Sequence, residues 1–149
     1  MKQNVLRDNK GIVLIIALLM LLVLTLLGIS SISSTVFETN IAGNDRVGAD
    51  AFYAAEAGVQ VGLNQLPAPN AIGRTKVGEE SYFWSGGPKD KGAPKDLQSF
   101  GLYQKAGYDA SWAFRRYQVN ATGESFGAAK EVEIQASMGP LSAGTEYNN

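Results

Sequence analysis

The sequence predicts an α+β protein, with one long N-terminal helix followed by a small antiparallel β-sheet domain. Three observations support this fold class. An uncharged apolar run extends from Gly11 to Ile32, and the first proline in the chain is Pro67. Further on, residues 113–122 and 130–137 alternate between apolar and polar side chains, as half-buried strands do. We therefore expect a continuous helix that ends near Leu66 and a sheet beyond it.

Composition limits both the size of the protein and its chemistry. The chain has 149 residues, enough for one ordinary domain and an appendage. It contains no His and no Cys, which excludes His-based triads, Cys nucleophiles, Cys/His zinc sites and disulfides. With 13 basic and 14 acidic side chains, the net charge of −1 argues against a nucleic-acid partner. We expect no metal site and no cofactor.

The run from Gly11 to Ile32 has the length of a transmembrane helix. Its 22 residues would span about 33 Å, and a bilayer core is about 30 Å thick. A buried core helix would show a polar face, which this run lacks. A cleaved secretory signal is the stronger alternative, although its apolar region is usually shorter. The flanking charges then predict the orientation. Three basic residues lie before the run against one acid, and the next basic residue is Arg46, so the N-terminus is predicted to be cytoplasmic.

The same helix is predicted to continue beyond the membrane and to become amphipathic. Apolar residues recur there at spacings of three and four, which gives one stripe for packing against the following domain. The stripe consists of Phe52, Ala55, Val59, Leu63 and Leu66. Between the membrane and this stripe, Gly28–Thr35 is rich in Ser, Thr and Ile, which are middling helix formers. That stretch is either a polar helix end at the membrane surface or a segment that loses helicity in a protein assembly.

At this point the residues resemble a known family. Lys10-Gly11 followed by a long uncharged helix resembles the class III signal of type IV pilins. The stretch Gly11–Leu27, together with AFYAAEAG at residues 51–58, resembles the N-terminal domain of the PilX minor pilins. The resemblance covers residues 7–66. It implies the same architecture as the residue patterns do: a long helix packed by a small sheet.

The resemblance also implies a processing pathway and a set of partners. Residues 1–11 would be a leader removed after Gly11 by the prepilin peptidase, which leaves Ile12 as an N-methylated N-terminus. Residues 12–35 would be the transmembrane and polymerising half of the helix. The implied partners are major and other minor pilins, the prepilin peptidase, the assembly platform of the bacterial inner membrane, and the membrane itself. The C-terminal domain would be periplasmic before assembly and at the cell surface afterwards.

One position departs from the pilin pattern. Most pilins have Glu as the fifth mature residue, and here that position is Ile16. The resemblance places Ile16 and Gly28 in the packing between subunits. A subunit without the carboxylate can still present its own amine to a neighbour, but it offers nothing to a neighbour's amine. This asymmetry favours a position at a filament tip; the alternative is that Ile16 only keeps the segment apolar.

The remaining chain divides into the amphipathic helix at 36–66 and a β-rich domain at 67–149. We expect a hairpin of Ala113–Thr122 and Lys130–Ser137 with a turn in Gly123–Ala129, and a third strand at Ser81–Trp84. Residues 85–94 read as a loop, and residues 139–149 as a mobile tail. The sheet should bury Tyr117 or Val119, together with Val132 and Ile134, against the helix.

No residue pattern predicts catalysis. The sequence has neither a phosphate-binding GxxxxGK[ST] motif nor a GxSxG motif, and Glu79 and Glu80 are adjacent and would face opposite sides of a strand. Three functions remain open. They are a minor pilin that initiates or caps a type IV pilus, a tip pseudopilin of a type II secretion system, and a single-span anchored binding module that never polymerises.

Overall fold

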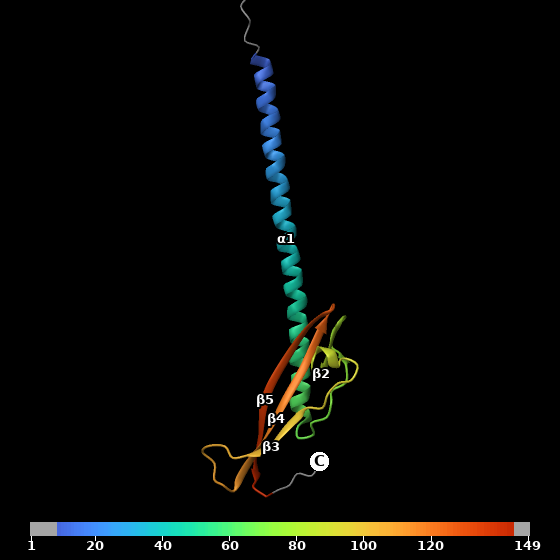
Figure 1. The fold of residues 1–149 in the computed structure, drawn as a ribbon, viewed down its shortest axis with the longest axis vertical. Helices are drawn as coiled ribbons and strands as arrows, with labels where there is room; N and C mark the ends of the chain where they lie inside the picture. Colours follow the sequence, from blue (N-terminus) through green and yellow to red (C-terminus); the bar gives the residue numbers. More distant parts are fainter. Residues whose placement is uncertain (1–8, 145–149) are drawn as a thin grey trace, which may run out of the picture. The chain divides into compact units, whose positions relative to one another are not determined.

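The computed structural model describes residues 9–144 and divides into two compact units, one ending at Gly43 and the other beginning at Asn44. Helix α1 (Asn9–Gln65) contributes to both units, and the second unit adds a five-stranded antiparallel sheet (Figure 1). The predicted α+β fold class is confirmed. Most of the predicted leader, residues 1–8, lies outside the described residues.

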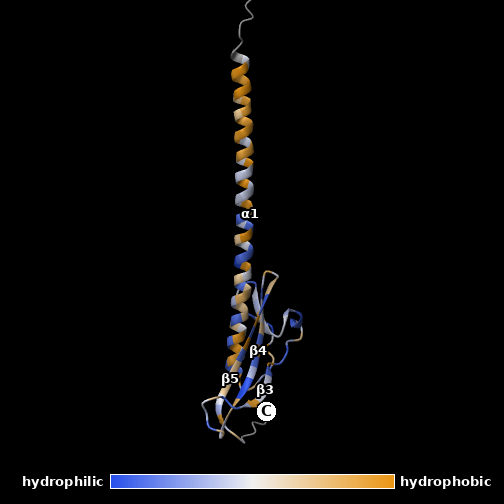
Figure 2. Ribbon diagram, turned by 60° about the vertical axis from the view of Figure 1, so that its left-hand side comes forward, coloured by the Kyte–Doolittle hydropathy of each residue, from blue (hydrophilic) through white to orange (hydrophobic). Residues whose placement is uncertain are grey.

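In the first unit, α1 carries apolar side chains on all of its faces. Every residue from Gly11 to Gly43 is exposed in the monomer, and Figure 2 shows the N-terminal part of this stretch as hydrophobic, followed by a mixed, more polar part. Several of its hydroxyl groups are satisfied within the helix. The side chains of Thr25, Ser33 and Thr35 each donate to a carbonyl one turn earlier, at 2.7–3.1 Å. Such internal bonds leave few polar groups that require water.

The sheet of the second unit is organised around one long strand, β4. One edge of β4 pairs with β5 along its whole length, and the other edge is shared by β2 and β3. β1 extends the sheet beyond β2. The strands are β1 (Thr75–Lys76), β2 (Ser81–Ser85), β3 (Gln98–Tyr103), β4 (Trp112–Ser125) and β5 (Ala128–Ser142).

The predicted hairpin is present, but its strands are longer and its turn is tighter than expected. The turn consists of Phe126 and Gly127 alone, with φ angles of 46° and 84°. Positive φ at both central residues is the geometry that fits the twist of a hairpin. Gly123, predicted to begin the turn, instead pairs with Phe83 and Lys130 inside the sheet.

Two further predictions require correction, and two strands were missed. Residues 139–142 are not a tail, because they belong to β5 and pair with the start of β4; residues 145–149 lie outside the described part of the chain. Residues 85–94 are not entirely a loop, because Ser85 is the buried end of β2 and Pro88–Asp90 forms the short helix η1. Strands β1 and β3 were not predicted.

The core lies between the C-terminal part of α1 and one face of the sheet. The buried helix face is built from small residues at spacings of three and four: Ala51, Ala54, Ala55, Gly58, Val59 and Gly62. A Cβ added at Gly123 would overlap the backbone of Ala51 and Ala55, and one at Gly62 would lie 2.6 Å from Val119. Helix and sheet therefore approach at backbone distance. The centre of this contact is a cluster of Val59, Leu97, Val119 and Ala121, against which Leu63, Val132 and Ile134 pack.

The prediction for Phe52 is wrong. Phe52 is 41% exposed, whereas Ala51 and Ala55, which belong to the buried face of the helix, are fully buried. The reason is steric. The helix backbone lies against Gly123, so the face that meets the sheet has room for Ala and Gly and not for an aromatic ring. The AFYAAEAG motif therefore places its small residues inward and its Phe and Tyr outward.

Candidate functional site

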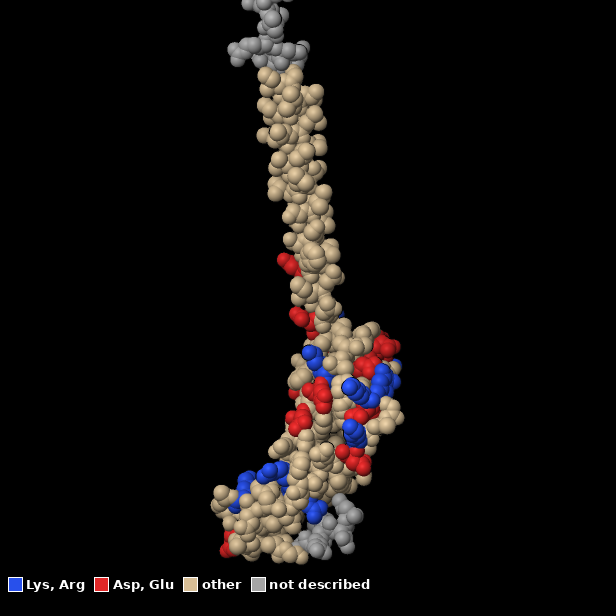
Figure 3. Space-filling model, in the orientation of Figure 1, with Lys and Arg blue, Asp and Glu red and all other residues tan. Residues whose placement is uncertain are grey.

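The first candidate site is the exposed apolar part of α1. From Gly11 to Phe37 the chain has no charged residue, and at 1.5 Å per residue this stretch measures about 40 Å. Helix α1 from Gly11 onward is long and apolar enough to cross a membrane, and nothing in the described fold buries its apolar segment. Figure 3 shows no acidic or basic side chain over this stretch. Such a surface is stable in lipid or in contact with other helices.

The structure leaves the predicted processing and packing residues free of contacts within the described chain. The side chains of Ile12 and Ile16 are more than half exposed. No heavy atom outside the helix backbone lies within 4 Å of a Cβ built at Gly11 or Gly28. These residues share one helix but do not converge on a site within the monomer. No residue of the second unit among those described contacts them.

The second candidate site is the outward face of α1 in the sheet-bearing unit. Phe52 and Tyr53 are 41% and 64% exposed, and their rings meet edge to face with centroids 6.0 Å apart. Beside Tyr53, a hollow between α1 and β5 is lined by Glu56, Val59, Val132 and Ile134, among others. An exposed aromatic pair next to half-covered apolar residues is typical of protein contact surfaces. Sequence reasoning placed Phe52 on the wrong face and therefore missed this pair.

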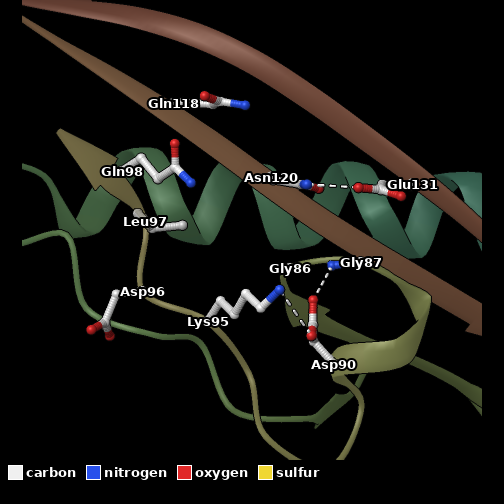
Figure 4. A pocket seen from close by; sticks show the side chains of 10 residues that line it. All are labelled: Gly86, Gly87, Asp90, Lys95, Asp96, Leu97, Gln98, Gln118, Asn120 and Glu131. Atoms are coloured by element: carbon white, nitrogen blue, oxygen red, sulfur yellow. Dashed lines mark hydrogen bonds and ion pairs between the residues drawn. The ribbon is translucent and has the colours of Figure 1, made fainter. Parts of the chain in front are cut away.

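The third candidate site is a polar pocket of about 260 Å³ on the sheet face away from α1 (Figure 4). Its walls come from the β2–β3 connection and from strands β3, β4 and β5. Lining side chains include Asp90, Lys95, Asp96, Gln98, Gln118, Asn120 and Glu131. Sequence reasoning missed the pocket because these residues are far apart along the chain. The only available signal was the pair of amide side chains two positions apart in β4, Gln118 and Asn120.

Within this pocket, the carboxylate of Asp90 is held in its ionised form. Its Oδ2 accepts a hydrogen bond of 2.9 Å from the Gly87 backbone N–H, and its Oδ1 lies 3.2 Å from Lys95 Nζ. The Gly87 hydrogen bond, with a smaller contribution from Lys95, lowers the pKa of Asp90 below the ordinary aspartate value of 3.8. The pair therefore stays charged at neutral pH. Among the described residues, no group of three or more acidic side chains is close enough to hold a metal ion.

Taken together, a long apolar helix that leads into a small antiparallel sheet is the arrangement of a pilin-like protein. Residues 10–60 match the family model described as PilX N-terminal, so this third of the chain is similar to the N-terminal domain of PilX proteins. The resemblance drawn from residues 7–66 is thereby confirmed, and the domain points to a minor pilin of a type IV pilus. The match stops before the sheet. No curated protein and no solved structure matches the chain significantly.

Proposed function

We propose that the protein is a minor pilin that helps to initiate or cap a type IV pilus, with a structural role and no catalytic one. The observation that carries this proposal is the match of residues 10–60 to the PilX N-terminal model over a helix whose apolar segment is entirely exposed. In this proposal, the prepilin peptidase cuts between Gly11 and Ile12. The mature helix then stays in the inner membrane until the assembly platform moves it into a filament.

The position of the subunit in the filament follows from Ile16. A buried carboxylate that pairs with a neighbour's N-terminal amine fixes the register between subunits, even where its net stabilisation is small. Ile16 cannot accept such an amine, whereas the amine of a processed Ile12 can still be offered to another subunit's carboxylate. The subunit would therefore accept one neighbour and not a second. This asymmetry supports a place at the filament tip and a low copy number.

The proposal is tested first by the intact mass of the protein from membranes and from sheared filaments. We expect a membrane form that begins at an N-methylated Ile12 and the same form at low abundance in the filament fraction. A Gly11→Trp variant should accumulate as a longer, uncut form. If the wild-type chain in both fractions still begins at Met1, the pilin proposal fails and a non-polymerising anchored module is the better account.

Immunogold labelling tests the tip position separately. We expect label at one end of wild-type filaments. An Ile16→Glu variant should enter the shaft and raise the share of the protein in sheared filaments, while Ile15→Glu is the matched control with the same charge one position away. Uniform labelling along wild-type filaments, or an equal share of the two variants in sheared filaments, would contradict the tip role. Neither result would contradict the assignment as a minor pilin.

A further inference from the structure

The polar pocket beside β4 has no part in helix-mediated assembly, and its hydrogen-bonding groups are incompletely used within the protein. Asn120 Nδ2 donates to Glu131 Oε1 at 2.6 Å, but Asn120 Oδ1 is buried and has no partner among the described residues. Gln98 and Gln118 lie opposite each other on β3 and β4. No hydrogen bond of either amide is found in the described part of the chain. A buried acceptor without a donor is costly unless something else supplies one.

The walls of the pocket are fixed before any ligand arrives. The connection from Gly86 to Asp96 is tied down at several points. Trp84 Nε1 donates to Gly87 O at 3.0 Å, and the backbone N–H of Lys95 donates to Ser85 O at 3.1 Å. At its end, Asp96 Oδ1 accepts from the Ala71 N–H at 2.9 Å. Because the loop is already ordered, a ligand would not have to supply the free energy of ordering it.

The chemistry of the lining selects the kind of ligand. The free amides offer both donors and acceptors, and Asn120 Oδ1 adds a buried acceptor. The lining contains three carboxylates, of Asp90, Asp96 and Glu131, and one cation, Lys95, so the local net charge of −2 disfavours an anion. A cationic ligand would be repelled by the Lys95 ammonium, and it would offer no acceptor to the amide N–H groups. Hydroxyl groups, each a donor and an acceptor, fit the mixture.

We propose that this pocket binds a neutral polyhydroxylated ligand of the size of one sugar residue. Its volume of about 260 Å³ limits the ligand to a single ring, and Leu97 provides the apolar contact. Gln98, Gln118 and Asn120 bind hydroxyl groups, while the Asp90–Lys95 pair holds the loop that closes the pocket. Ligand binding in this pocket does not depend on filament assembly, and it would give the sheet domain a separate function.

The test uses the full chain, labelled with ¹⁵N, in micelles of a detergent without a sugar head group. The protein has two Trp residues, which give two indole N–H signals. Trp84 lies beneath the pocket loop, whereas Trp112 is at the opposite end of β4 and serves as an internal control. The probes are D-glucose, D-galactose, D-mannose and N-acetyl-D-glucosamine, with D-glucuronate, D-glucosamine and L-lysine as charged comparisons.

We expect at least one neutral sugar to shift the Trp84 signal saturably and to leave Trp112 unchanged. Gln118→Ala, which removes a side chain that makes no hydrogen bond to the residues that the structure describes, should weaken binding about tenfold. Gln135→Ala is the matched control, since Gln135 lies opposite Gln118 on β5 but does not line the pocket. Gln98→Ala replaces Gln118→Ala if the latter alters the Trp112 signal.

Three results would overturn the proposal. The first is no shift with any neutral sugar. The second is a shift only with L-lysine and D-glucosamine, which would make the pocket a cation site. The third is an equal affinity of the wild type, the pocket variant and Gln135→Ala.

Discussion

Two stretches of helix α1 differ in what covers their side chains. Residues 12–37 carry no charge and are apolar on every face as far as Ile29, and all are exposed in the monomer. Residues 51–62 carry small residues on one face, and that face is buried by the protein's own sheet. Both stretches are α-helical, so helix formation does not distinguish them. The difference lies in side-chain size and distribution: the first stretch can be covered only by lipid or by other molecules, and the second is already covered.

The largest expected effect separates the two faces of the sheet-bound stretch. Phe83 packs against Gly58 of α1 and is 3% exposed, whereas Phe52 is on the outward face of α1. Phe83→Ala should lower the free energy of unfolding by about 3–5 kcal/mol, and Phe52→Ala by less than about 1 kcal/mol. Chemical denaturation of the full chain in detergent, followed by Trp fluorescence, measures both. Equal losses would show that Phe52 is buried in the protein.

A lysine placed in each stretch of α1 tests what surrounds it. Leu22→Lys puts a charge near the middle of the apolar run, where it should oppose membrane insertion by about 2.5–3.5 kcal/mol. Gln60→Lys is the matched change on an exposed position of the sheet-bound stretch and should have no such effect. Alkaline extraction of membranes reports the fraction inserted. If Leu22→Lys resists extraction as the wild type does, residues 11–32 do not span the bilayer.

A single methyl group tests how closely helix and sheet approach. Gly123→Ala would place a Cβ into the backbone of Ala51 and Ala55, so the layers must separate. We expect a loss of up to about 3 kcal/mol in the free energy of unfolding. Gly73→Ala is the control, because no atom lies within 4 Å of the added Cβ there. Similar melting of the two variants would contradict the close contact.

The smallest expected effect concerns the pH dependence of the pocket loop. The pKa of Asp90 is lowered in the folded protein, so its contribution to stability is present above 3.8 and is lost as the pH falls through the folded-state pKa. Asp90→Asn should therefore melt slightly below the wild type at neutral pH, and the difference should vanish in acid. Thermal melts between pH 2 and pH 7 measure it. A difference that grows in acid would have the wrong sign.

The elements that could be predicted from the sequence are those whose residue pattern lies within the element itself. The apolar run, the helix end before Pro67 and the alternation in β4 and β5 depend on neighbouring residues. Strand β3 was missed because Gln98–Tyr103 has no alternation and contains a Gly. Residues 139–142 were assigned to a tail because the partner that holds them, the start of β4, is distant in sequence.

The candidate sites were harder to predict than the fold. Phe52 lies at the correct spacing for the apolar stripe, but its orientation depends on Gly123, which is far away in the chain and seemed to be a turn residue. The pocket around Gln118 and Asn120 depends on a loop folding back over β4. In both cases a contact between distant segments decided the outcome, and single-sequence patterns carry no information on such contacts.

The close approach at Gly123 also has a mechanical consequence. When tension acts along α1, it reaches the sheet as shear between two layers that run alongside each other (Figure 1). The backbone of Ala51 and Ala55 sits over Gly123, and the neighbouring residues on the same face of β4, Ala121 and Ser125, have side chains. To slip by one residue, the layers must first move apart, which exposes Val119 and Ala121 to water. The sheet-bearing unit therefore resists sliding through the shape of its contact, without a disulfide between helix and sheet.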